Sequence, residues 1–424
     1  MKSKFMSALL LALGITFAHA QTNLTVHEWG TFTSLQGGNG QLISWRPLKT
    51  SELPGFVYSW TNPGFGRFSP VMAGGKGEMI TLQRMETPVI YFYSSTTLNA
   101  DVSVKFPKGT ITEWYPQATQ IGPSLSIASN SIPDAATPDS LIVWKGLVVS
   151  PDHRIQQPPK LISDNTGNHY YAARKTDSDI VQTALLSPGS PSGSEKFLFY
   201  RGAGSFETPL KVTVDTNNRV TVENKGPEKL SHLFLVSIHK SIGAYAEMDG
   251  LTPGNSVPWR NLDSAAIDDW KRFPLPEFQY EIVTRMQSAL TDQGLSAPEA
   301  EAMVKTWLDS WFTEEGERVL YILPRTWTDE TLPLTITPKP DNLVRVMVGR
   351  AEIITPKTQQ ALTDNLTRAS KGDATARSEA IEQLRKLGRF AEPAINLAAV
   401  HGNPEDFGYY GFGLLPEVLK PSQK

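Results

Sequence analysis

The feature that most constrains this fold is a succession of short segments, from Leu24 to about Lys240, in which apolar and polar residues alternate. The clearest segments read "VIYFYSS", "DVSVKFPKG" and "LKVTVDTNNRVTVEN", and Gly, Pro, Asn or Ser separate them. Alternation over about four to eight residues is typical of a β-strand with one buried face. Asn217-Asn218 lies where the last segment would turn back on itself. The pattern predicts a β-sandwich body of Ig-like type.

The hydrophobic period changes to that of a helix in two later parts of the chain. "EFQYEIVTRMQSALTDQG" and "SAPEAEAMVKTWLDSWF" carry apolar residues at helical spacing. Gly294 separates these two segments, and Ser296 and Glu299 form a capping box at the start of the second. At the C-terminus, "TQQALTDNLTRASKG" and "ARSEAIEQLRKLGRFAEPAINLAA" predict two further helices. The stretch "LRKLGRFAEPAI" resembles the second helix of a HEAT-type repeat. Since a HEAT solenoid needs at least about three repeats, we expect this pair to cap the β-rich body.

The two patterns together predict an α+β protein that is predominantly β. Its expected parts are a β-sandwich (Ig-like) body, an inserted helical hairpin and a C-terminal HEAT-like helix pair. At about 100–200 residues per domain, a chain of 424 residues should form two or three domains. The changes of pattern give these boundaries: a signal peptide at 1–20, an N-terminal β-rich domain at 21–192, an Ig-like portion at 193–273, a helical hairpin with returning strands at 274–356, and a helix pair with a tail at 357–424.

The first part of the chain is typical of a secretory signal peptide. Lys2 and Lys4 precede an apolar run that ends at Phe17, and Ala18-His19-Ala20 has the small residues of a cleavage site. The run is shorter than the roughly 20 apolar residues of a membrane-spanning helix, and the sequence shows no later transmembrane segment. We therefore expect cleavage after Ala20 and export to the periplasm or the surrounding medium.

Composition excludes several classes of site. The chain has no cysteine, which removes disulfides, thiolate metal ligands and a thiol nucleophile. A chain of this length buries about three quarters of its unfolded surface, so it folds without such cross-links. Loss of the two positive charges of Lys2 and Lys4 would take the formal net charge from −3 to −5. Because no run of Lys and Arg is present to neutralise phosphates, nucleic acid is not an expected partner.

Several strings make the chain similar to a group of secreted bacterial proteins that have no assigned activity. They include "VHEWGTFTSL", "RMETPVIYFY", "FPKGTITEWYP" and "FLFYRGAG", and the resemblance extends over most of the chain after the signal peptide. The resemblance implies export and a bacterial source. It implies no activity, cofactor or site. The cofactor therefore stays unknown, and the site must be inferred from the residues themselves.

Three glutamates fall on strand faces that otherwise look apolar. Residues i and i+2 of a strand share a face. Alternation then gives these groupings: Glu28 with Val26 and Phe32, Glu113 with Ile111 and Tyr115, and Glu86 with Ile90 and Phe92. A buried carboxylate must be paired, hydrogen-bonded or protonated, because unpaired burial of a charge is strongly unfavourable. These positions are therefore the main candidates for a functional or structural role.

One interpretation of the glutamates is a carbohydrate site. Glycoside hydrolysis uses two carboxylates, one as general acid and one as base or nucleophile. Glu28 and Glu113 are the candidate catalytic pair. Flat aromatic side chains suit sugar rings, and the expected binding residues come from the same strands and their neighbour: His27, Trp29, Glu86, Trp114, Tyr115 and Arg201. The expected ligand is a polysaccharide of the envelope or its surroundings.

The alternative interpretation is structural, with glutamate–arginine pairs that join strands and Arg201, Arg325 and Arg350 as candidate partners. The function would then be non-catalytic assembly at the envelope, with a protein partner bound to the C-terminal helices or the β faces. A metal-dependent hydrolase is a third hypothesis. Its support is weak, because the histidines show no HExxH or comparable spacing, and the sequence predicts no metal ligand.

Overall fold

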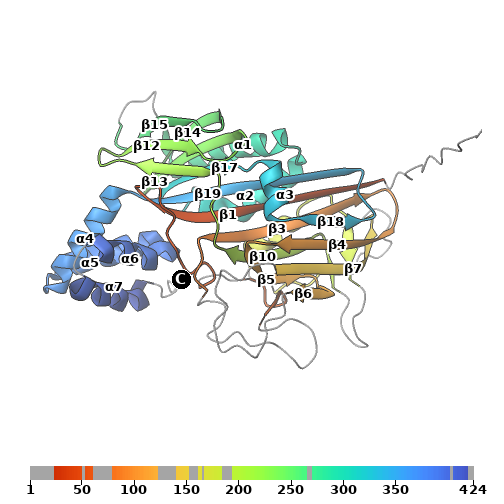
Figure 1. Cartoon of the computed structure of the whole chain (residues 1–424), viewed down its shortest axis with the longest axis horizontal. Coiled ribbons are helices and arrows are strands. Elements are labelled where there is room, and N and C mark those ends of the chain that lie inside the picture. The colour runs from red at the N-terminus through yellow and green to blue at the C-terminus, as the bar shows by residue number, and fades with distance from the viewer. Residues whose placement is uncertain are drawn as a thin grey trace, which may run out of the picture.

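The computed structural model describes residues 23–49, 53–60, 79–122, 140–151, 161–164, 167–183, 193–264, 270–401 and 404–418. The predicted signal peptide at 1–20 lies outside them. The described part is mostly β, as predicted, and Figure 1 shows its long strands running through the centre of the molecule. None of its helices has the length and apolar character needed to cross a membrane.

The centre of the fold is a ten-stranded sheet in the order β16-β14-β13-β17-β19-β1-β3-β10-β5-β2. Its strands are β1 (Leu24–Gly37), β2 (Tyr58–Ser59), β3 (Gln83–Ser94), β5 (Gly109–Tyr115), β10 (Leu198–Gly204), β13 (Leu230–His239), β14 (Ile242–Leu251), β16 (Lys271–Pro274), β17 (Gly316–Ile322) and β19 (Asn342–Ile354). The strands β1 and β19 are parallel neighbours, so segments far apart in the sequence meet in the middle of the sheet. The other neighbours in this sheet pair antiparallel.

Two smaller sheets cover one face of the large sheet. The first contains β11 (Leu210–Val214), β12 (Arg219–Asn224) and β15 (Ser256–Asn261). The second contains β4 (Leu98–Phe106), β6 (Gln120–Gly122), β7 (Ser140–Ser150), β8 (Ile180–Gln182), β9 (Ser194–Glu195) and β18 (Leu334–Thr337). Apolar side chains of both pack with the large sheet in one core. The predicted turn at Asn217-Asn218 joins β11 and β12, and Asn218 has φ 57°. The strands within residues 193–273 divide among all three sheets, and the Ig-like arrangement is not confirmed.

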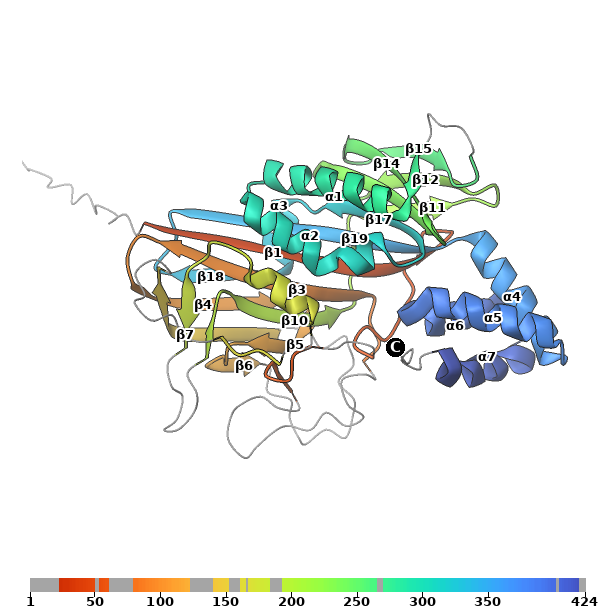
Figure 2. The same ribbon diagram turned by 180° about the vertical axis from the view of Figure 1, so that it is seen from behind.

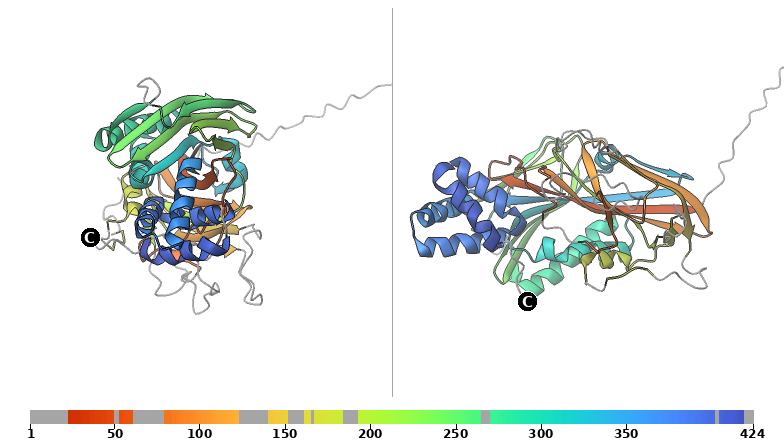
Figure 3. Two further views of the ribbon diagram at one scale, coloured as in Figure 1. Left: turned by 90° about the vertical axis from the view of Figure 1, so that its left-hand side faces the viewer. Right: turned by 90° about the horizontal axis from the view of Figure 1, so that it is seen from below.

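Helices cover the opposite face of the large sheet, as Figures 2 and 3 show. They are α1 (Leu275–Asp292), α2 (Ala297–Phe312) and the short 3-10 helix η3 (His169–Arg174). The predicted helical hairpin forms, because Ser296 and Glu299 cap α2 reciprocally and Gly294 supplies the left-handed backbone between the helices, with φ 102°. A further short helix, α3 (Arg325–Thr331), follows β17 and was not predicted.

Four helices pack against one end of the large sheet (Figure 1). They are α4 (Pro356–Ser370), α5 (Ala374–Leu387), α6 (Ala391–His401) and α7 (Pro404–Val418), with the 3-10 turn η4 (Gly388–Phe390) between α5 and α6. Leu35 and Ile354 from the ends of β1 and β19 join their apolar core. The sequence predicted one helix where α5 and α6 lie. Gly388 divides it, because its φ of 52° suits glycine and ends α5. The expected HEAT-like pair is therefore not confirmed.

Candidate functional site

Glu28 lies in the core beneath the smaller sheets and is fully buried. Its neighbour in β19 is Arg345, whose Nε donates to Glu28 Oε2 at 2.5 Å, and Tyr200 Oη donates to Oε1 at 2.5 Å. Burial, and then the charge of Glu28, raise the pKa of Tyr200 well above its ordinary value, so the phenol stays a donor. Both oxygens of this carboxylate are therefore engaged, one by a group of the adjacent strand β19 and one by a group of β10.

Glu113 forms a second buried pair. It lies opposite Arg201 in the β5–β10 ladder, with Arg201 Nη2 to Glu113 Oε1 at 2.7 Å and Arg201 Nε to Oε2 at 3.1 Å. Both side chains are almost completely buried. Such a bidentate pair of guanidinium and carboxylate is the strong form of ion pair. Arg201 is thus a pairing partner of a glutamate, as the structural interpretation expected.

The structure does not bring the two predicted catalytic glutamates together. Ile90, opposite Glu28, belongs to the core beneath the smaller sheets, whereas Tyr115 and its partner Phe199, next to Glu113, belong to the core beneath the helices. The two carboxylates therefore face opposite sides of the sheet. The expectation that they share one cleft is wrong, because a register shift in the β5–β10 pairing breaks the alternation between Ile111 and Glu113.

The predicted aromatic walls are core residues. Trp29 and Trp114 are fully buried and belong to the two different cores, and Tyr115 packs against Phe56 with ring centroids 4.8 Å apart. His27, another predicted binding residue, lies outside these two cores. Its Nδ1 lies 2.8 Å from the carboxylate of Glu299 on α2, an interaction that ties β1 to the helical layer.

Glu86 also lies away from its expected face. Thr87 has φ 48°, and the β1–β3 register shifts beside it, so Glu86 pairs with Thr31 on the helical side while Ile90 stays on the other side. Its Oε1 is 2.9 Å from Arg389 Nη1 and 3.2 Å from Arg84 Nε. Burial raises the pKa of Glu86, but these arginines more than offset burial and bring that pKa to about 2.

A cleft of about 870 Å³ lies where the end of the large sheet meets α4, α5 and η4. Its size is that of a small-molecule site. Its carboxylates are Asp263, Glu314, Glu315, Glu317, Glu352 and Glu382, and its basic side chains are His239, Lys357, Arg385, Lys386 and Arg389. Sequence reasoning missed this cleft, since its walls come from distant segments. The one sequence signal was the pair Arg350 and Glu352, which continue an apolar strand face.

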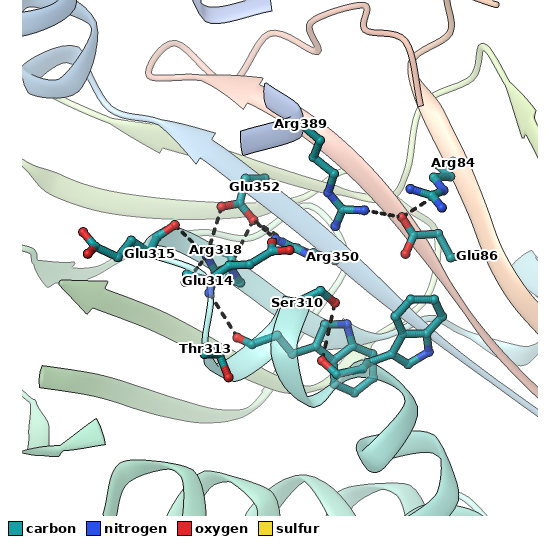
Figure 4. A network of polar contacts seen from close by, with 12 residues as sticks. Arg84, Glu86, Ser310, Thr313, Glu314, Glu315, Arg318, Arg350, Glu352 and Arg389 are labelled. Carbon is teal, nitrogen blue, oxygen red and sulfur yellow. Dashed lines mark hydrogen bonds and ion pairs between the residues drawn. The ribbon is translucent and has the colours of Figure 1, made fainter. Parts of the chain in front are cut away.

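The inner wall of the cleft is a network of ion pairs, shown in Figure 4. Glu352 accepts hydrogen bonds from Arg318 Nε at 3.0 Å and Arg350 Nη2 at 2.7 Å, and Arg350 Nη2 also reaches Glu314 at 2.9 Å. Burial raises the pKa of Glu352, but the two arginines more than offset it and the pKa is lowered. Figure 4 shows Arg389 extending toward Glu86, which connects the cleft to the Glu86 cluster.

At the rim of the cleft, Glu317 lies 2.5 Å from His239 Nε2, and this hydrogen bond raises the pKa of His239. Lys386 on α5 lies 3.4 Å from Glu315, which joins the C-terminal helices to the segment before β17. Within the described residues, no group of three or more His, Asp or Glu side chains is arranged to hold a metal ion. The carboxylates and basic side chains of the cleft offer a ligand hydrogen-bond acceptors, donors and charge.

Comparison with protein-family models and with curated proteins found no match. Among solved structures, the chain is similar to the Fcho1 mu homology domain of Danio rerio with bound Eps15 peptide, with 8% identity and a TM-score of 0.28 over 80% of this chain and 99% of that one. It is also similar to the yeast delta-COP-I mu-homology domain complexed with a Dsl1 WxWxV peptide, with 7% identity and a TM-score of 0.24 over 80% of this chain and 98% of that one. At such low TM-scores the likeness carries no argument about this chain.

Proposed function

We propose that this chain is an exported bacterial protein that binds a carbohydrate in the cleft between the large sheet and the C-terminal helices. The observation that carries the proposal is the lining of that cleft, where carboxylates and basic side chains lie together in a volume of about 870 Å³. Clefts of this size with convergent polar groups are the usual sites for small ligands.

The chemistry of sugar hydroxyls fits this lining. A hydroxyl both donates and accepts, whereas a carboxylate only accepts and a lysine or arginine only donates. A wall that offers both kinds of group can therefore hold several hydroxyls of one ring. Leu387 and Phe390 on the helical side, with Ile353 and Ile354 on the sheet side, add apolar surface for the C–H faces of a sugar.

We propose binding in place of hydrolysis at the predicted pair. Two glycosidase carboxylates flank one bond at about 5–10 Å, whereas Glu28 and Glu113 face opposite sides of the sheet and each is engaged by an arginine. The catalytic roles predicted for these residues stay predictions. For Glu113, the stability of Glu113→Gln tests the catalytic role against a structural one.

The cleft is tested by calorimetric titration of the mature protein with a panel of neutral and acidic oligosaccharides. Glu382 lines the cleft on α5. Glu382→Gln should lower the affinity for the tightest-binding oligosaccharide by about fivefold to tenfold, because one charged acceptor is lost. The matched control is Glu277→Gln, an exposed residue of α1 that does not line the cleft, and its affinity should equal that of the wild type. Absence of binding across the panel would refute the proposal.

Export is part of the proposal and rests on the signal-like residues 1–20. N-terminal sequencing of protein recovered from a bacterial periplasm or culture medium should begin at Gln21. A chain that retains Met1 in the cytoplasm would contradict export. The Ig-like character of 193–273 and the HEAT-like character of the C-terminal helices stay predictions as well. The packing of α4 with α5 and of α6 with α7 supports the latter.

A second function is a protein partner bound at the C-terminal helices. The observation that favours it is the exposure of Val400 on α6, at 77%, and of Phe412 on α7, at 38%. The helices α6 and α7 pack against each other, and contiguous exposed apolar patches mark interaction sites. Affinity-tagged wild-type chain should co-purify an envelope protein, and the tagged Val400→Glu chain should not. Recovery of the wild type alone from cross-linked cells would count against this function.

A further inference from the structure

A row of three polar side chains crosses the middle of the large sheet. Arg350 of β19 lies beside Thr33 of β1, and Thr33 lies beside Arg84 of β3. Neighbouring strands are about 4.8 Å apart, so the three side chains stand next to one another. All three are more than nine-tenths buried, with exposures of 1%, 0% and 7% in that order.

Arg389 adds a fourth polar side chain from the η4 turn. Its guanidinium lies 5.1 Å from the centre of the Phe390 ring, and that of Arg350 lies 5.8 Å from the same ring. Its Nη1 is 2.9 Å from Glu86 Oε1, and Glu86 is also the ion-pair partner of Arg84. The four side chains therefore surround one small region between the sheet and η4. We call Arg350, Thr33, Arg84 and Arg389 the arginine row.

The arginine row has an excess of donors. Five of its buried polar atoms form no hydrogen bond with any described residue: Nη1 of Arg350, Oγ1 of Thr33, Nε of Arg84, and Nε and Nη2 of Arg389. Arg84 Nε is within ion-pair distance of Glu86 but is not aligned for a hydrogen bond. Four of the five atoms are N–H donors, and a threonine hydroxyl can also donate. Buried donors on charged groups are strongly unfavourable without an acceptor, and the described residues supply none for these atoms.

The charges of the region also indicate that a negative group would be favourable there. Four arginines take part in its ion pairs (Arg84, Arg318, Arg350 and Arg389), against three glutamates (Glu86, Glu314 and Glu352), which leaves one positive charge in excess among these side chains. Burial lowers the pKa of Arg84 to about 9 despite the opposing effect of Glu86. An additional negative charge beside this guanidinium would offset its burial.

We propose that the arginine row binds an oxyanion, in the form of a carboxylate or a phosphate group. Arginine is suited to both, because its planar fork can donate two parallel hydrogen bonds to their oxygens. Arg389 also lines the cleft, and Glu352 and Glu314, which also line it, bond to Arg350. Resting on the function proposed above, the oxyanion is the acidic group of the bound carbohydrate, so the ligand class is a uronic-acid or phosphorylated sugar.

The hydroxyl of Thr33 provides a sharp test with a matched control in the same strand. Thr31 is equally buried on the same face, but its Oγ1 already donates to Val348 O at 2.7 Å. Calorimetric titrations of the mature protein with sodium phosphate and with sodium galacturonate, at constant ionic strength, should show saturable binding. Thr33→Val should lower the affinity for each anion by about fivefold, through loss of one hydrogen bond. Thr31→Val should leave both affinities unchanged.

Arg389→Gln should lower the affinity for the same two anions by at least about tenfold, since it removes a charged donor. If Arg389→Gln does not fold, Thr33→Val decides the matter, because valine has nearly the shape of threonine. The proposal is overturned if the wild type binds neither anion, or if Thr33→Val binds both as tightly as the wild type.

A neutral control separates this proposal from the carbohydrate function. Binding of galactose oligomers with no binding of phosphate or galacturonate would remove the oxyanion site and retain the carbohydrate cleft. Binding of phosphate that depends on Thr33 and Arg389, with no binding of any oligosaccharide, would retain the oxyanion site and remove the carbohydrate. Binding of galacturonate oligomers at least about tenfold tighter than galactose oligomers, lost in Arg389→Gln, would support both.

Discussion

The helical side of the large sheet holds buried arginines in two contrasting ways. Between β5 and β10, Arg201 and Glu113 match each other with two hydrogen bonds, and neither side chain has a buried polar atom without a partner among the described residues. In the arginine row, on β19, β1 and β3, Arg350 and Arg84 retain donors that meet no acceptor among the described residues. Arginine thus forms an internal cross-link in one place, and in the other it has donors available for the proposed oxyanion. Burial of arginine alone does not distinguish the two; the balance of donors and acceptors does.

The largest expected effect comes from breaking the matched pair. Glu113→Gln would leave the Arg201 guanidinium buried without a countercharge, and loss of one partner of a buried ion pair costs about 3–5 kcal/mol of unfolding free energy. Denaturant unfolding of the variant and of the exposed control Glu277→Gln measures the difference. A Glu113→Gln protein as stable as the wild type would show that the pair is not architectural and would restore Glu113 as a catalytic candidate.

The next effect concerns acid stability near the arginine row. The folded pKa of Glu86 is about 2 against an ordinary value of 4.5, so this carboxylate stabilises the fold above pH 4.5 and loses that contribution as the pH falls toward 2. The shift corresponds to about 3 kcal/mol. Unfolding free energies of the wild type and Glu86→Gln should therefore converge between about pH 5 and pH 2. A constant difference across this range would mean that the arginines do not hold the charge of Glu86.

The contrast between the two regions shows what a sequence can reveal. Local patterns were sufficient for the β11–β12 hairpin and the capped helix α2, because each depends on residues close together in the chain. Alternation also identified Glu28 as a buried carboxylate. It also predicted burial of Glu86 and Glu113 correctly, but it grouped Glu86 with Ile90 and Glu113 with Ile111 on the wrong face. A single irregular residue in a strand moves every later side chain to the other face, and no local signal marked those positions.

The candidate site depended on long-range pairing that alternation cannot supply. Thr33 and Arg350 meet only because β1 and β19 pair in parallel, although more than 300 residues separate them. Arg389 reaches the same region from a turn that Gly388 creates inside a stretch predicted to be one helix. Each residue is unremarkable in its own segment. Their placement as a group follows from register and packing, which become known only with the whole fold.

A smaller effect compares the two threonines of β1 in the absence of any anion. Thr31→Val should lower the unfolding free energy by about 1 kcal/mol, because it removes a buried hydrogen bond and leaves Val348 O without that donor. Thr33→Val removes a hydroxyl that has no partner among the described residues, so stability should be unchanged or slightly higher. Urea titrations in anion-free buffer measure both. A similar loss in the two variants would show that Thr33 already has a structural partner.

The smallest effect belongs to the rim of the cleft, where a charged pair is exposed to solvent. Hydrogen bonding to Glu317 raises the pKa of His239, so its stabilising contribution is complete below about pH 6.5 and is lost as the pH rises through the raised value. The side chain of His239 is 62% exposed, and solvent screening keeps such a contribution below about 1 kcal/mol. Stability of the wild type relative to His239→Asn should thus decline slightly between pH 6 and about pH 9. A large decline would mean that the rim pair is shielded from water. The pair of His239 and Glu317 would then resemble the buried pair of Arg201 and Glu113.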